Sequence, residues 1–136
     1  GALLEQLSRD LAPRVRAEVA RNSATSGELL ARLAIDDAEL VRSAAGSNPA
    51  LPVECFAALV EDPEFLPRWC AVSNPGAPAE LLARFARSRE SMMRKAVAEN
   101  PAAPLELLLE LMEDRDHAVL LCAWGHPRVR EHLRRG

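Results

Sequence analysis

The stretch Met93-Arg94-Lys95-Ala96-Val97-Ala98-Glu99-Asn100-Pro101-Ala102-Ala103-Pro104-Leu105-Glu106-Leu107-Leu108 holds a pattern that recurs along the whole chain. Its asparagine recurs every 26 residues, and a histidine stands one period after the last one: Asn22, Asn48, Asn74, Asn100 and His126. Serine or proline follows each of them, and glutamate stands six residues after each asparagine. So many positions in phase indicate a tandem array of short repeats.

Aspartate and arginine recur with the same period. The aspartate positions, one of which holds serine, are Asp36, Asp62, Ser88 and Asp114. The arginine positions are Arg16, Arg42, Arg68 and Arg94. A capping role is expected for the aspartates, because serine caps a helix or turn about as well as aspartate but could not serve as an anionic ligand.

Each repeat predicts two short helices. The second helix is expected to begin at the proline four residues after the asparagine, because proline suits the first helical position. The first repeat lacks this proline and has Thr25-Ser26-Gly27-Glu28, a capping-box pattern. Apolar residues, mostly leucine, seven, eight and eleven residues after the asparagine then form one apolar stripe.

The first helix of the third repeat is irregular, because both Pro63 and Pro67 fall near its start. Proline inside a helix removes a hydrogen bond and clashes with the preceding turn. The sequence therefore predicts a turn over residues 62–66 and a helix that starts near Pro67.

The quoted stretch resembles the leucine-rich repeat variant (LRV) family, and the resemblance covers residues 2 to about 130. It implies an all-α, right-handed α-solenoid or superhelix of paired α- and 3₁₀-like helices, without β-strands. Some members carry a cysteine cluster for an iron–sulfur centre ahead of the repeats, and nothing in this chain matches that cluster. The family implies no established activity.

The expected organisation is a single helical-repeat array over residues 1–136. It comprises a half-repeat at 2–12, repeats at about 13–38, 39–64, 65–90 and 91–116, and a divergent C-terminal repeat at 117–136. The half-repeat exposes apolar residues with no polar helix ahead of them: Leu3, Leu4, Leu7 and Leu11. This end is therefore expected to pack on another copy of the chain or on upstream repeats.

Composition excludes several classes of function. The net charge of −3 gives no strong attraction to nucleic acid or anionic lipid, and no apolar run is long enough to span a membrane. No catalytic motif is recognisable, so we expect no enzyme, no metal and no cofactor. The three cysteines lack ligand spacing and are interpreted as small buried apolar residues of a reducing, cytoplasmic protein.

The recurring polar residues have structural and functional interpretations. The asparagines are interpreted as a ladder that bonds nearby backbone and joins consecutive repeats. The four arginines form either a basic stripe for an acidic partner or pairs with carboxylates of the same or a neighbouring repeat; their regular spacing favours the pairs. Trp69 stands where other repeats hold unrelated residues, so it is expected to be exposed. With Arg68 it is either a binding hot spot or a filler over the neighbouring repeat.

The leading functional hypothesis is a protein–protein interaction scaffold, because stacked repeats present an extended surface. The first alternative is a nucleic-acid-binding helical-repeat module with a groove built on the arginines. The second is a structural repeat region of a larger protein, including an iron–sulfur protein.

Overall fold

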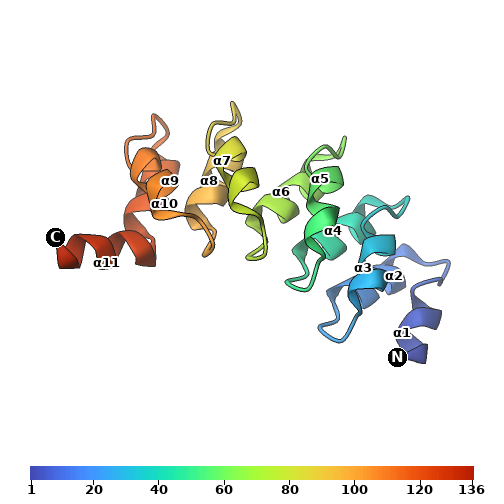
Figure 1. Ribbon diagram of the computed structural model, residues 1–136. Helices are drawn as coiled ribbons and strands as arrows, with labels where there is room; N and C mark the ends of the chain where they lie inside the picture. Colours follow the sequence, from blue (N-terminus) through green and yellow to red (C-terminus); the bar gives the residue numbers. More distant parts are fainter. The chain divides into compact units, whose positions relative to one another are not determined.

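The computed structural model describes residues 1–136, and its only regular elements are helices. They are α1 (Ala2–Leu7), α2 (Pro13–Arg21), α3 (Gly27–Leu33), α4 (Glu39–Ser47), η1 (Val53–Cys55), α5 (Phe56–Leu59), α6 (Phe65–Ser73), α7 (Ala79–Phe85), α8 (Ser91–Glu99), α9 (Leu105–Leu111), α10 (His117–Gly125) and α11 (Pro127–Arg135) (Figure 1). The predicted all-α repeat fold is confirmed.

The period of the sequence is also the period of the helices. Helices α2, α4, α6, α8 and α10, which we call the long helices, each have nine residues. Each is followed directly by an asparagine or, after α10, by His126. Shorter helices lie between them: α3, the η1–α5 segment, α7 and α9. Only η1 is a 3₁₀ helix, whereas the resemblance implied 3₁₀-like helices throughout.

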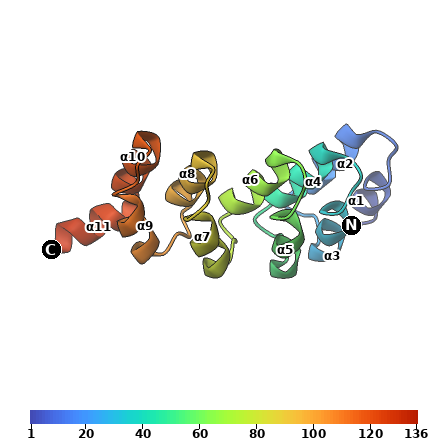
Figure 2. The same cartoon turned by 90° about the horizontal axis from the view of Figure 1, so that it is seen from above.

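The chain divides into two compact units, residues Gly1–Gly76 and Ala77–Gly136. In the first unit α4 packs between α2 and α6, and in the second α10 packs against α8, α9 and α11. Within each unit the long helices form one row and the short helices another (Figure 2). Residues on the facing sides of the two rows form the apolar cores.

Several apolar side chains are completely or almost completely buried in each core. In the first unit they are Leu30, Val41, Phe56, Leu59 and Val72; in the second they are Leu82, Met93, Val97, Leu108, Val119 and Val129. Burying a side chain of this size contributes about 1.5–3 kcal/mol relative to leaving it exposed. The predicted leucine stripe therefore does what its spacing indicates, since Leu30 and Leu108 stand at the same position of their repeats.

Two helix starts differ from the sequence expectation. Pro78 and Pro104 are N-caps with extended backbone, so α7 and α9 begin one residue later than predicted. Helix α6 begins at Phe65, so the prediction of a start near Pro67 with a turn through residue 66 was wrong. Pro67 is the third residue of α6, and the first four N–H groups of a helix have no acceptor within it, so proline costs no hydrogen bond there.

The asparagines join consecutive long helices. Asn48 Nδ2 donates to the carbonyl oxygens of Ala20, at 2.8 Å, and Asn22, at 3.1 Å. Asn74 Nδ2 makes the same two bonds one period later, to Gly46 and Asn48, at 2.7 and 2.9 Å. Each side chain also closes its own turn, because Asn48 Oδ1 accepts the N–H of Ala50.

His126 replaces asparagine in the second unit without loss of the bond. Its Nε2 lies 2.9 Å from the carbonyl oxygen of Asn100, and its Nδ1 accepts the backbone N–H of Arg128. Since Nδ1 is an acceptor, the proton is on Nε2, which donates to Asn100.

Asn48→Ala is expected to destabilise the protein by about 1–3 kcal/mol, because it leaves the buried carbonyl of Ala20 without a donor and removes one of the two donors to the Asn22 carbonyl. Asn22→Ala is the matched control, since Asn22 closes the same kind of turn but its Nδ2 meets no carbonyl. Urea unfolding monitored by circular dichroism measures both variants. Equal destabilisation by the two substitutions would contradict the role given to the ladder.

Candidate interaction surface

The arginine positions lie on the long helices, and three of them make bidentate ion pairs. Arg16 Nε lies 2.8 Å from Asp36 Oδ2, and Arg42 Nε lies 2.7 Å from Asp62 Oδ2; in both, Nη2 donates to the other carboxylate oxygen. Each pair joins one long helix to the turn that precedes the next one. In the second unit, Arg94 and Asp114 are paired in the same way at 2.8 Å.

The third nitrogen of each guanidinium binds the backbone. Arg42 Nη1 donates to the carbonyl oxygens of Asp36 and Asp37, at 2.9 and 3.0 Å. The paired side chains are mostly buried, with exposed fractions of 15% for Arg42 and 7% for Asp62. Of the two hypotheses for these arginines, the geometry corresponds to pairing with carboxylates, and their donors are not arranged as a basic stripe.

The aspartates have the predicted capping role, but each caps the turn before a long helix and not the helix itself. Ala38 is the N-cap of α4, and Asp36 stands two residues before it, where its Oδ1 accepts the N–H of Ala38 at 2.9 Å. The side chain therefore closes a turn and receives an arginine. Ser88 accepts the N–H of Glu90 at 3.1 Å, which is why serine can hold this position.

Hydrogen bonding outweighs burial at these carboxyl groups. Burial raises the pKa of Asp62, but hydrogen bonds from Arg42 and from the N–H of Glu64 lower it further, so the net shift is downward from 3.8. Burial also raises the pKa of Asp36, but the hydrogen bonds from Arg16 and from the N–H of Ala38 lower it by more, so its net shift is downward as well. At Asp114 the hydrogen bond from Arg94 is the largest cause of the lowered pKa.

Arg68 lies beside an aromatic ring. Its Nη1 donates to the carbonyl oxygens of Asp62 and Pro63, at 2.9 and 3.2 Å. Its guanidinium carbon lies 5.8 Å from the centroid of the Phe65 ring, within the range of a cation–π contact. Arg68 is thus held in place next to an aromatic side chain that reaches the surface.

A group of large apolar side chains lies at the surface of α4 and α6, and we call it the α4–α6 patch: Leu40, Phe65, Leu66 and Trp69. The first three are 38%, 37% and 41% exposed, and Trp69 is half-buried, not exposed as predicted. Leu40 and Leu66 occupy the same position on two neighbouring helices. Phe65 and Leu66 lie four and three residues before Trp69, on one side of α6.

The sequence pattern indicated Trp69 and Arg68 as candidate contacts but not the other residues of this patch. The signal was present, since the second residue of consecutive long helices is Leu40, Leu66 and then Met92. These residues stand outside the buried stripe of each helix. Met92, in the second unit, is 50% exposed.

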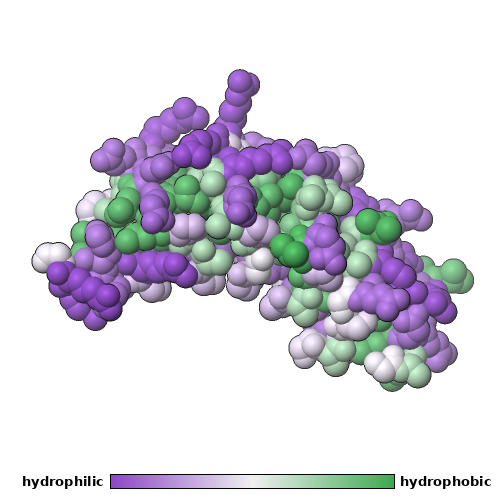
Figure 3. All heavy atoms as spheres, viewed as in Figure 1, coloured by the Kyte–Doolittle hydropathy of each residue, from purple (hydrophilic) through white to green (hydrophobic).

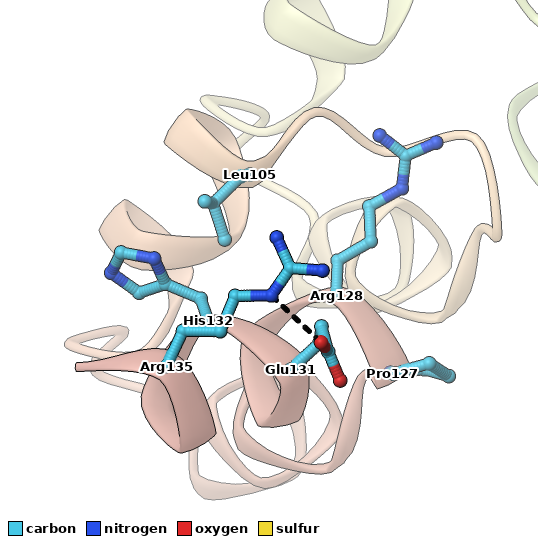
Figure 4. Close-up of a pocket in the computed structure, with 6 residues that line it drawn as sticks. All are labelled: Leu105, Pro127, Arg128, Glu131, His132 and Arg135. Atoms are coloured by element: carbon cyan, nitrogen blue, oxygen red, sulfur yellow. Dashed lines mark hydrogen bonds and ion pairs between the residues drawn. The ribbon is translucent and has the colours of Figure 1, made fainter.

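A concave region lies in the second unit, between the start of α9 and α11. It has a volume of about 470 Å³ and is lined by Leu105, Pro127, Arg128, Glu131, His132 and Arg135. Figure 4 shows Arg135 bonded to Glu131 beside His132, whereas Arg128 extends away from the pair. No buried polar group points into this depression, so it offers no fixed site for a ligand.

Neither the cysteines nor the histidines form a cluster. Burial raises the pKa of all three thiols. Cys70 is buried as predicted, whereas Cys55 and Cys122 are only half-buried. No group of three or more His, Cys, Asp or Glu side chains is placed to hold a metal ion. None of the helices has the length and apolar character needed to cross a bilayer.

The sequence profile of the family described as "Leucine rich repeat variant" matches residues 93–116, the repeat that contains the Arg94–Asp114 pair. A solved structure described as "a leucine-rich repeat variant with a novel repetitive protein structural motif" superposes with a TM-score of 0.66 at 28% sequence identity. Residues 93–116 thus match the LRV repeat, and the fold of the chain is similar to that of a solved LRV protein. The match covers 91% of this chain and 49% of the solved LRV chain, so this chain spans about half the length of that protein. None of the curated proteins matches its sequence.

The repeats of this chain are expected to lose stability on acidification. The pKa of Asp36, Asp62 and Asp114 is lowered from 3.8 in the folded chain, so the unfolded chain binds protons more readily. The stability that these ion pairs contribute is present above pH 3.8 and is lost as the pH falls through the folded values. Thermal unfolding between about pH 6 and pH 2.5 measures the loss.

The control for this experiment is the triple variant Asp36→Asn, Asp62→Asn, Asp114→Asn. It lacks the three carboxyl groups and should therefore lose less stability over the same pH interval. If the variant and the wild-type chain lose stability in parallel, the ion pairs are not the groups responsible.

Proposed function

We propose that this chain is a protein-interaction scaffold and that its α4–α6 patch binds a partner protein. The observation that supports the proposal is the exposure of Leu40, Phe65 and Leu66 on two adjacent helices, next to Trp69. Contiguous apolar surface on a repeat protein is typical of interaction sites. Tryptophan and arginine are also among the residue types most enriched in interface hot spots.

The rigidity of the two helices supports the same proposal. A Cβ atom added at Gly46 of α4 would lie 3.4 Å from the Cβ of Cys70 on α6, so the two helices pack closely. Arg68 lies over Phe65 and binds two backbone carbonyls of the preceding turn. A surface held in this way loses little conformational entropy when a partner binds.

The chemistry around the patch defines the kind of partner. Glu39 and Glu64 are exposed and directly precede Leu40 and Phe65 in the sequence. Arg14 and Arg21 line a depression with Leu40, and Arg68 lies over Phe65. A complementary surface therefore presents apolar side chains flanked by charged residues of both signs.

The rival hypothesis of nucleic-acid binding has lost its main support. It relied on the arginine positions, and Arg16, Arg42 and Arg94 are bonded to carboxylates. Exposed basic side chains gather instead on α11: Arg128, Arg130, Arg134 and Arg135. We further propose that the chain acts in the cytoplasm by binding and not by catalysis, in keeping with its free thiols and the lack of a recognisable catalytic motif.

Trp69→Ala is expected to weaken partner binding by about 2 kcal/mol or more, because it removes the largest side chain of the patch. Leu66→Glu should weaken binding as well, since a carboxylate would enter the centre of an apolar contact. Ile35→Ala is the control, because Ile35 is 72% exposed but lies outside the patch. The partner is captured from cell extract with the wild-type chain, purified, and titrated with each variant by calorimetry.

Circular dichroism of each variant separates loss of binding from loss of fold. If Leu66→Glu folds and binds as tightly as Ile35→Ala, the patch is not the interface. Tight binding to DNA or RNA that weakens steeply with salt would instead favour the nucleic-acid alternative.

A further inference from the structure

The joints between long helices in the first unit share one set of interactions. In the joint between α2 and α4, α2 contributes Arg16 and the carbonyl oxygens of Ala20 and Asn22. The turn before α4 contributes Asp36, which binds Arg16, and the end of α4 contributes Asn48, which donates to the two carbonyl oxygens. Around them lie apolar side chains that are at most 3% exposed: Leu30, Leu33, Val41 and Ala45.

The N-terminal end of the first unit carries residues equivalent to Asp36 and Asn48, the α3–α4 side of this joint. The residues one period earlier are Asp10 and Asn22, with the apolar residues Leu4, Leu7, Val15 and Val19. The four apolar residues, with Glu18 and Asn22, line an open groove of about 220 Å³. Figure 3 shows green, hydrophobic side chains at the surface around α1, and Leu3 beside this groove is 66% exposed. We call this set of residues the N-terminal face.

The polar groups of the N-terminal face have their local bonds but not their partners across a joint. Asp10 Oδ1 accepts the N–H of Ala12 at 2.8 Å, as Asp36 does with Ala38. Arg16 donates to the backbone carbonyl oxygen of Asp10 at 2.8 Å, but no arginine binds the Asp10 carboxylate. Asn22 Oδ1 accepts the N–H of Ala24, yet its Nδ2 reaches no carbonyl. Asn22 is exposed, whereas Asn48 and Asn74 are only 3% and 1% exposed.

A second copy of this chain does not present the complementary groups. Leu120 stands at the arginine position of α10, the last long helix. The carbonyl oxygen of His126 already accepts the N–H groups of Val129 and Arg130 in the first turn of α11. Two N-terminal faces brought together would oppose carboxylate to carboxylate and amide donor to amide donor, which is unfavourable.

We propose that the N-terminal face is a docking surface for a further α-helical repeat, one that presents an arginine to Asp10 and two backbone carbonyls from a helix C-terminus to Asn22. The apolar groove receives the leucines of that repeat. The proposal is independent of the α4–α6 patch, which lies on the outer side of α4 and α6.

The chain itself supplies a suitable probe. A copy of residues 79–104 joined directly ahead of Gly1 continues the period of 26 residues. The copied Arg94 then precedes Asp10 by 20 residues, the separation of Arg16 and Asp36. The copied Ala98 and Asn100 precede Asn22 by 28 and 26 residues, the separations seen at Asn48.

The extended chain is expected to gain helical signal and to melt about 5 °C or more above the original chain. Asp10→Ala and Asn22→Ala should each lower the melting temperature of the extended chain by several degrees, while shifting that of the original chain by about 1 °C or less. In the extended chain, replacing the copied arginine by leucine, as at Leu120, should remove the dependence on Asp10.

Three outcomes would overturn the proposal. The extension could remain unfolded, with no gain in helical signal. Asp10→Ala and Asn22→Ala could have equal effects in the original and extended chains. The original chain could form a dimer in sedimentation that Leu4→Glu dissociates, which would make a second copy the occupant of this face. Each result is obtained without any knowledge of the partner of the α4–α6 patch.

Discussion

The bonds that join successive long helices are the constraint on which the structure depends. Helices of seven to nine residues are too short to be stable alone in water, so each needs its neighbours. The asparagine amide satisfies carbonyl groups at the end of the preceding long helix, where no partner exists within that helix. The arginine binds a carboxylate in the turn before the next long helix, and it also binds backbone carbonyls in the turn before its own helix. Together these contacts fix the spacing of the helices and prevent successive long helices from shifting along one another.

This use of the polar residues determines which parts of the surface remain for binding. Arg42, Asp62 and Asn48 look like surface residues in the sequence, but all three are engaged in the joints. The side chains that remain outward on α4 and α6 are largely apolar, and they form the α4–α6 patch. A repeat in which the joints and the outer surface use different residues can vary its outer residues without changing the joints, as at the second residue of the long helices, which is Leu40, Leu66 or Met92.

The sequence predicted the period, the helical class and the role of the asparagines, because these depend on local turn chemistry and on spacing. It predicted a capping role for Asp36 but did not decide between a turn and a helix, since both kinds of cap use the same residue types. The partner of each arginine required the packing of two helices, which no local pattern encodes. The half-burial of Trp69 also depends on the side chains of neighbouring helices. Pro67 was misplaced because the exact start of a helix decides whether proline breaks it.

A double-mutant cycle on Arg42 and Asp62 tests the central claim most directly. Arg42→Leu and Asp62→Ser use residues that this chain itself carries at equivalent positions, Leu120 and Ser88. Free energies of unfolding are measured for the wild-type chain, the two single variants and the double variant. A mostly buried bidentate pair should give a coupling energy of about 1–2 kcal/mol. A coupling energy near zero, as is common for exposed ion pairs, would contradict the account, because the pair would then not hold the two helices together.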